Sequence, residues 1–306
     1  MCFTIIYTTD MNHSHHNISR HHVADVLFRY SISFLRIASI TILIFLVCFM
    51  AYKAYPAFHE IGLFQLVFTD QWRPVIYDTE PLFGLRNMLL ATLYVSALAC
   101  VCALFIGVGC ALFLSCGVSE RVRHILMPCI DLLAGIPSVV YGFIGLCVVV
   151  SHLETQGMAT GESVLSGAFV LSVMILPYII SSTTHSMVSI RSSVELNARS
   201  LGTSVWYMAS ELVLPACVKG ILVSCGLALG RAMGETMAVM MVMGNAPIFP
   251  TLLGKGETIA SLLALEMGTA EVASLHFSSL FAAAFILLVV LLLINLVFLY
   301  AHKKLA

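Results

Sequence analysis

Two charged residues stand in a long apolar stretch of the sequence. Arg231 and Glu235 are the charged residues of segment 220–243. Inserting a guanidinium at the middle of a membrane helix costs roughly 2.5–3.5 kcal/mol on insertion scales, so a functional role is expected for this residue. The spacing of four predicts a shared helix face and an ion pair. Arg231 is therefore a candidate to bind an oxyanion through bidentate donors, with Glu235 holding it when the site is empty. A purely structural ion pair is the alternative interpretation.

A second candidate group surrounds a proline in another apolar segment. Pro137 lacks a backbone donor and clashes with the preceding helical turn, so a kink or break should free carbonyls near Leu133. Unpaired backbone in a membrane is tolerated where it lines protein or water. Gly135, Ser138 and Tyr141 are thus predicted to face a polar path. A packing kink, with Ser138 bonded to its own helix, is the alternative.

The composition indicates the environment of these residues. The chain has 306 residues, of which 60% are hydrophobic and 10% charged, against roughly 25% charged in soluble domains. A water-exposed surface needs more charge, so much of the outside must face lipid. The formal net charge of -1 argues against a nucleic-acid binder. Most of the ten cysteines lie in apolar runs without metal-ligand spacing, so we expect small buried side chains and no metal site.

Six membrane-spanning helices can be placed on apolar segments of about 20 residues. Three of them lie within stretches without any Asp, Glu, Lys or Arg: 87–119, 163–190 and 272–302. The predicted spans are 32–52, 88–115, 125–150, 164–184, 218–243 and 277–300.

The distribution of lysine and arginine predicts the orientation. Ten of the 15 basic residues fall on one side when both termini are placed in the cytoplasm, and the loop 53–87 then lies outside. We expect residues 1–30 to form a cytoplasmic tail and residues 31–306 a transmembrane domain, with Met1 or Met11 as the start. The tail contains His13, His15, His16, His21 and His22, which we interpret as a solvated segment because no Cys or carboxylate completes a metal site.

The inner loop 190–217 has the pattern of a short helical hairpin. Gly202 can adopt the left-handed conformation of a turn, and Pro215 lies at the end of the hairpin. Between them, residues 205–208, including Trp206, and Leu212 provide apolar positions at helical spacing. A protruding knob with exposed aromatic residues is typical of a docking element. An amphipathic helix lying on the bilayer surface is the alternative.

This loop resembles the coupling motif of ABC importer permeases, a short helix that sits in a groove of the ATPase. The matching positions are Ala198, Gly202, Leu212, Leu214 and Pro215. The motif's acidic position holds Leu196, and the nearest acid, Glu195, is one residue early. This departure changes the acidic contact of the motif and leaves the pattern of the knob intact.

Two further segments resemble signatures of phosphate-specific permeases. They are Leu133-Ala-Gly-Ile-Pro-Ser-Val-Val-Tyr-Gly142 and Gly230-Arg-Ala-Met-Gly-Glu-Thr-Met-Ala-Val239. The Met-Ala-Val ending favours a PstC-like over a PstA-like subunit. The resemblance covers the chain from about residue 64 to its end.

The resemblance implies an all-α, type I (MetI-like) permease fold in a bacterial inner membrane. It implies a non-catalytic subunit that translocates phosphate beside a PstA-like permease, two PstB-like ATPase subunits and an external PstS-like phosphate-binding protein. ATP would bind to the ATPase subunits, because this chain has no Walker sequence and we expect it to bind no cofactor.

Other functions stay open at this stage. Sulfate, molybdate or phosphonate would also suit an arginine. An ion-coupled secondary transporter could use Arg231 and Glu235 as a charge relay, although such a protein needs no ATPase dock. An intramembrane enzyme is disfavoured, because the spans have no zinc, Ser-His or paired-Asp motif.

Overall fold

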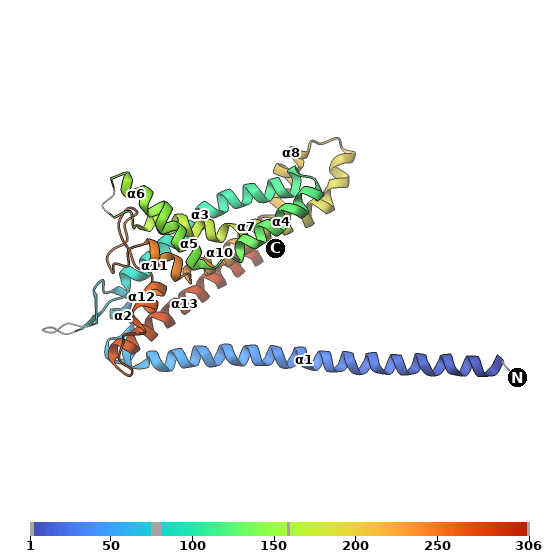
Figure 1. The fold of residues 1–306 in the computed structure, drawn as a ribbon, viewed down its shortest axis with the longest axis horizontal. Helices are drawn as coiled ribbons and strands as arrows, with labels where there is room; N and C mark the ends of the chain where they lie inside the picture. Colours follow the sequence, from blue (N-terminus) through green and yellow to red (C-terminus); the bar gives the residue numbers. More distant parts are fainter. Residues whose placement is uncertain (1–2, 75–80, 158–159, 305–306) are drawn as a thin grey trace. The chain divides into compact units, whose positions relative to one another are not determined.

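The computed structural model describes residues 3–74, 81–157 and 160–304. These residues form helices and one small two-stranded sheet (Figure 1). The chain divides into two compact units, Met1–Tyr52 and Lys53–Ala306. The predominance of helices confirms the predicted all-α class.

The first unit is the N-terminal part of one long helix, α1 (Phe3–Glu60), which passes residue 30 without a break. Its segment Phe28–Glu60 is apolar and long enough to cross a membrane, and no side chain of its most apolar window is buried. Large apolar side chains such as Phe34 and Phe45 are exposed along it, as expected of a helix in contact with lipid. The side chains of the five N-terminal histidines and Met1 lie outside the described residues, so the interpretation of the tail stays a prediction.

The second unit contains the remaining elements. In chain order they are α2 (Leu63–Phe68), β1 (Trp72–Arg73), β2 (Leu82–Phe83), α3 (Arg86–Leu112), η1 (Phe113–Gly117), α4 (Glu120–Ala134), α5 (Ser138–Ile144), η2 (Gly145–Val150), α6 (Ser151–Thr155), α7 (Val164–Ser200), α8 (Val205–Tyr207), η3 (Met208–Val213), α9 (Leu214–Ala216), α10 (Val218–Met233), α11 (Met237–Val242), α12 (Ile259–Glu266) and α13 (Leu275–Lys304). The η elements are π-helical turns that continue the neighbouring α-helices.

Among the described residues, five helical segments are long and apolar enough to span a membrane. They are Phe28–Glu60, Arg86–Gly117, Ser138–Thr155, Val164–Ser200 and Leu275–Lys304. A sixth span is obtained when the pair Val205–Ala216 and Val218–Met233, bent by 62°, is counted as one. The predicted number of six is therefore confirmed with this bent pair.

Two of the predicted spans are broken: the kink or break predicted at Pro137 is confirmed, and the continuity expected of 218–243 is wrong. The span 125–150 breaks at residues 135–137, because Pro137 cannot donate a backbone hydrogen bond and starts α5 as its N-cap. The span 218–243 breaks at residues 234–236, between the end of α10 at Met233 and the start of α11 at Met237. Both breaks fall inside the segments that carry the candidate site.

The core of the second unit is the packing of α3 along α7. Ala99 and Ala103 of α3 are fully buried with Ile175 and Ile179 of α7 in one apolar cluster. A Cβ atom at Gly107 would lie 2.7 Å from Ile179 Cγ2. Small side chains on α3 let the two helices approach closely, which is how helices commonly associate in membranes.

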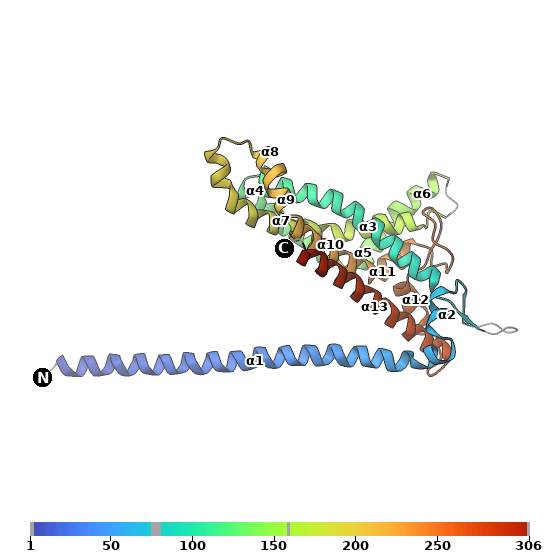
Figure 2. The same cartoon turned by 180° about the vertical axis from the view of Figure 1, so that it is seen from behind.

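The two ends of this unit carry different structures. Figure 2 shows α8 and α9 beside the end of α7, and α2 and α12 at the opposite end. At the end with α2, strands β1 and β2 pair antiparallel, with Trp72 opposite Phe83. Helix α12 begins there with a capping box formed by Thr258 and Ser261.

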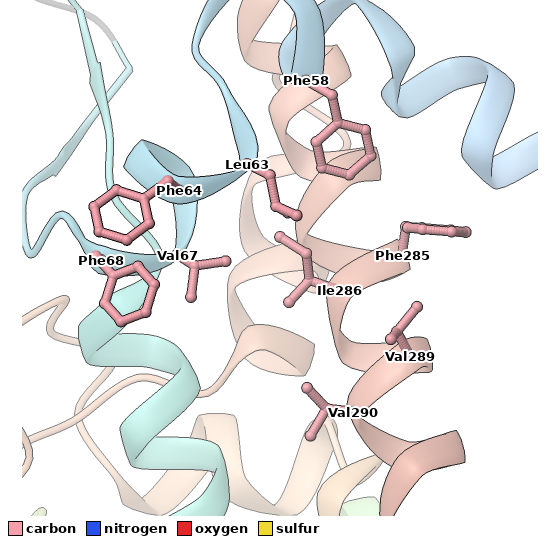
Figure 3. A pocket seen from close by; sticks show the side chains of 9 residues that line it. All are labelled: Phe58, Leu63, Phe64, Val67, Phe68, Phe285, Ile286, Val289 and Val290. Atoms are coloured by element: carbon pink, nitrogen blue, oxygen red, sulfur yellow. The ribbon is translucent and has the colours of Figure 1, made fainter.

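An apolar pocket of about 720 Å³ lies between Phe58 in the last turn of α1, α2 and α13 (Figure 3). Its lining side chains carry no charge or polar group: Phe58, Leu63, Phe64, Val67, Phe68, Phe285, Ile286, Val289 and Val290. Phe64 and Phe68, with ring centroids 4.5 Å apart, are both mostly exposed. Such a surface suits hydrocarbon and agrees with a membrane environment for this unit.

Candidate functional site

Arg231 lies in the last turn of α10 and is held by an aromatic ring. Its Cζ atom lies 4.2 Å from the ring centroid of Tyr178 on α7, a cation–π contact. The Arg231 side chain is exposed. The ring therefore positions the guanidinium and leaves its N–H donors available to a ligand.

The predicted ion pair between Arg231 and Glu235 does not form. An i,i+4 pair requires a continuous helix, and α10 ends at Met233, with Gly234 as its C-cap. Glu235 Oε1 instead accepts a hydrogen bond from the backbone N–H of Ala238 at 3.4 Å, at the start of α11. Within residues 28–74, 81–157 and 160–304, no carboxylate pairs with Arg231. Its positive charge is therefore not neutralised within this part of the chain.

The break around Pro137 leaves carbonyl groups that two tyrosines satisfy. The hydroxyl of Tyr141 donates to Leu133 O at 2.9 Å, and the hydroxyl of Tyr178 donates to Ala134 O at 2.7 Å. This confirms that the break frees carbonyls near Leu133. Tyr178 thus connects the broken segment to Arg231, a role that sequence analysis missed. A hydroxyl-bearing aromatic residue in an uncharged apolar segment is the signal that could have indicated it.

The other residues predicted near the break differ in exposure. Gly135 and Pro137 are exposed, and Ser138 is half-buried at the start of α5. The Ser138 hydroxyl makes no hydrogen bond with the described residues. The alternative interpretation, a hydroxyl bonded to its own helix, is therefore wrong, and Ser138 keeps a donor and an acceptor for another group.

The two signature segments pack directly on each other. A Cβ atom added at Gly142 of α5 would lie 2.9 Å from Ala238 Cα and 2.9 Å from Met241 Sδ of α11. The absence of a side chain at Gly142 allows this close approach. The structure therefore joins the break at 135–137, the aromatic support of Arg231 and the break at 234–236 into one junction.

The loop after α7 forms the predicted knob. Gly202 has φ +68°, and Ser204 caps α8 by accepting from the N–H of Tyr207 at 3.2 Å. Thr203 fixes the turn, because its hydroxyl donates to Ala198 O at 2.8 Å. Trp206 is 67% exposed. The prediction of a turn at Gly202 followed by an exposed aromatic residue is confirmed.

The buried side of the knob packs against the end of α7. Ala198 is buried in a cluster with Met208, Ala209 and Val213. Leu214 packs against the same cluster, Leu212 is partly exposed, and Pro215 is the second residue of α9.

Glu195, the carboxylate nearest the motif's acidic position, forms hydrogen bonds with arginines of this same chain. Glu195 accepts two hydrogen bonds from Arg191, at 3.0 and 3.1 Å, and a further one from Arg199. Arg191 also donates to the carbonyl of Ser115 in η1, the π-helical turn that continues α3. Sequence analysis missed Arg191, although its spacing of four from Glu195 was visible. These contacts fix the loop to the helix bundle.

Ionisable side chains also gather at the opposite end of the unit. Glu266 accepts hydrogen bonds from Trp72 Nε1 at 3.0 and 3.1 Å and lies 2.8 Å from His276 Nε2. Glu257, in the loop before α12, is 5% exposed. Burial, followed by the charge of Glu266, raises the pKa of Glu257 to about 8. Glu257 therefore retains its proton near neutral pH.

The chain belongs to the family described as binding-protein-dependent transport system inner membrane component, which residues 103–306 match. The broken helices and the exposed loop described above lie within this range, whereas the span Phe28–Glu60 and the first half of Arg86–Gly117 precede it.

Individual relatives agree with this family. The chain is 32% identical over 271 residues to the probable ABC transporter permease protein YqgH of Bacillus subtilis, covering 87% of this chain and 86% of that protein. It is 34% identical over 252 residues to the phosphate transport system permease protein PstC of Mesorhizobium japonicum, covering 76% of each.

Solved structures show the same fold. A chain of the MetNI methionine ABC transporter in an inward-facing conformation superimposes with a TM-score of 0.58 at 12% identity, covering 72% of this chain and 95% of that one. A chain of an amino acid ABC transporter gives a TM-score of 0.52 at 16% identity, covering 71% and 92%. The predicted MetI-like fold is thereby confirmed.

Proposed function

We propose that this chain is a non-catalytic permease subunit of an ATP-driven importer and that its substrate is inorganic phosphate. The observation that carries the proposal is Arg231, an exposed guanidinium supported by Tyr178 and paired with no carboxylate among the described residues. Relatives that are phosphate transport system permease proteins support the choice of anion.

The junction provides the groups that a phosphate ion in transit needs. Arg231 offers planar, bidentate N–H donors, and the ring of Tyr178 holds them in place without cancelling their charge. Ser138 offers a hydroxyl at the neighbouring helix break. We infer that one guanidinium and neutral hydroxyls bind phosphate weakly enough for its release. Glu235, Gly135, Pro137 and Tyr141 are proposed to shape this path rather than to hold the anion.

The knob provides the connection to an energy source. Its exposed residues, including Trp206 and Val205, form an apolar protrusion that fits a groove of an ATPase subunit. Because Glu195 ties the loop to α3 and α7 through Arg191, a movement of the knob would be transmitted to those helices. ATP binding would then open the path outward and hydrolysis would reset it inward.

The proposed assembly follows from this division of roles. It contains this chain, a PstA-like permease, two PstB-like ATPase subunits that bind the ATP, and an external PstS-like binding protein. We place it in a bacterial inner membrane with both termini of this chain in the cytoplasm, as the basic residues favour.

Uptake in cells tests the substrate. Cells lacking their own high-affinity phosphate system receive this chain with its proposed partners, and labelled phosphate uptake is measured with excess unlabelled phosphate, sulfate or molybdate as competitor. We expect ATP-dependent uptake that only phosphate suppresses. Suppression by sulfate or molybdate at equal concentration would overturn the choice of phosphate and leave the family assignment intact.

A further inference from the structure

A pocket of about 380 Å³ opens at the end of the unit where α3 begins. Its charged and amide-bearing lining residues are Asp70, Gln71, Arg73, Arg86 and Asn87. Helix α3 has 27 residues and begins at Arg86, beside this pocket. Its other end leads to Ser115, whose carbonyl accepts a hydrogen bond from Arg191 near the knob. At about 1.5 Å per residue, this pocket lies about 40 Å from that end of α3, well away from the exposed loop.

Two guanidinium groups supply positive charge to the pocket. Arg73 is held by β1, where it pairs with Leu82 of β2, and Arg86 is the first residue of α3. Both side chains are exposed, and neither forms an ion pair with residues in 28–74, 81–157 or 160–304. Two arginines that line one cavity and form no ion pair in that part of the chain outnumber the single carboxylate of its lining, Asp70, and this positive charge fits an oxyanion.

One acceptor in this pocket is accessible to a ligand. The exposed side chain of Asp70 is the only carboxylate among the lining residues. Its position is fixed by Asn87, which is 6% exposed and whose Nδ2 donates to Asp70 O at 2.8 Å and to Pro247 O at 3.3 Å. An acceptor beside arginines favours a ligand that carries both negative charge and a proton to donate.

We propose that this pocket is a second oxyanion site, selective for hydrogen phosphate over fully deprotonated oxyanions such as sulfate. Phosphate near neutral pH keeps a P–OH group that can donate a hydrogen bond to Asp70, whereas sulfate would bring only lone pairs to that carboxylate. The choice of phosphate, and the placement of the pocket on the outer side, rest on the function proposed above. The site would receive the anion before it reaches Arg231.

Chemical protection of the arginines tests the site directly. The intact complex of this chain with its permease and ATPase partners, without external binding protein, is treated with phenylglyoxal, and modification of each arginine is followed by peptide mass spectrometry. We expect inorganic phosphate to slow modification of Arg73 and Arg86 severalfold, and sulfate at the same ionic strength to have little effect. Arg121, an exposed arginine in the first turn of α4, is the internal control and should react equally in both salts.

The variant Asp70→Asn tests the origin of the selectivity. Because Asp70 is exposed, the substitution should leave the fold intact. It replaces a charged acceptor with a neutral amide, so sulfate should now protect both arginines nearly as well as phosphate. Equal protection by both salts in the native complex, or no protection at all, would overturn the proposal. Protection that appears only when external binding protein is added would overturn it too, and would identify a protein docking surface.

The protection experiment tests the pocket, and the uptake assay tests the import function, so each proposal can be refuted without the other. Phosphate uptake without selective protection refutes the pocket alone. Selective protection without phosphate uptake refutes the proposed import function and leaves the anion site.

Discussion

Substitution of Gly142 by alanine should separate the two signature segments. The new Cβ would lie 2.9 Å from the backbone Cα of Ala238, which cannot move aside as a flexible side-chain end could. Overpacking of this kind costs about 1–3 kcal/mol, offset by about 0.5–1 kcal/mol from replacing a helical glycine. We expect a net loss of about 1–2 kcal/mol in the free energy of unfolding, with a shift of α5 against α11.

Gly109→Ala is the matched control. It also replaces a helical glycine, but its Cβ would have no neighbour within 4 Å, so we expect an unchanged or slightly higher melting temperature. Both variants are compared with native protein by thermal unfolding in detergent and by phosphate uptake at equal membrane abundance. Gly142→Ala should lower the melting temperature by several degrees and reduce uptake, because it displaces Tyr141. Native stability and uptake in Gly142→Ala would refute the close packing of the two segments.

Three further predictions concern the junction, the knob and the buried carboxylate. Tyr178→Phe keeps the ring under Arg231 but leaves Ala134 O without its donor, so thermal unfolding should show a loss of about 0.5–1.5 kcal/mol, and native stability would contradict this role. Trp206→Ser should weaken co-purification of the ATPase subunits several-fold without lowering the melting temperature, because Trp206 is exposed; unchanged co-purification would exclude it from the interface. Glu257 keeps its proton up to a pKa of about 8 in the folded protein, whereas the unfolded chain releases it near about pH 4.3. The folded state therefore binds more protons between these values, stability should fall as pH rises through this interval, and Glu257→Gln should flatten that fall in melting curves. An equally steep fall in the variant would assign the pH dependence to other groups.

The membrane-spanning helices could be predicted because their signal is carried by composition alone. Long segments without charge, such as 163–190, predict membrane-spanning helices, and α7 and α13 begin within two residues of the predicted starts. The end of α7 was predicted wrongly, because the helix continues past residue 184 to Ser200, into the segment expected to be a loop. Whether a helix is continuous depends on individual residues such as proline and glycine, which the mean hydropathy of a segment does not detect. The predicted ion pair between Arg231 and Glu235 required both residues to lie on one continuous helix. Helix α10 ends at Met233, with Gly234 as its C-cap, so Glu235 lies beyond the helix that carries Arg231.

The knob was predictable for a different reason. A left-handed turn at Gly202 and a proline at the end of the hairpin are local requirements that particular residue types satisfy. Tyr178 could not be assigned in the same way, because its two contacts reach Ala134 and Arg231, which are distant in sequence. Contacts of this kind become visible only when the helices are packed.

The central claim, that Arg231 contacts phosphate during ATP-driven import, is tested most directly in proteoliposomes. The complete complex is reconstituted with native protein, Arg231→Ala or the control Arg121→Ala, and both phosphate accumulation and ATP hydrolysis are measured with loaded external binding protein. We predict that Arg231→Ala abolishes accumulation while hydrolysis continues, because the knob and its contacts are intact, and that Arg121→Ala resembles native protein. Accumulation by Arg231→Ala at the native rate would contradict the account and leave Arg231 a structural residue.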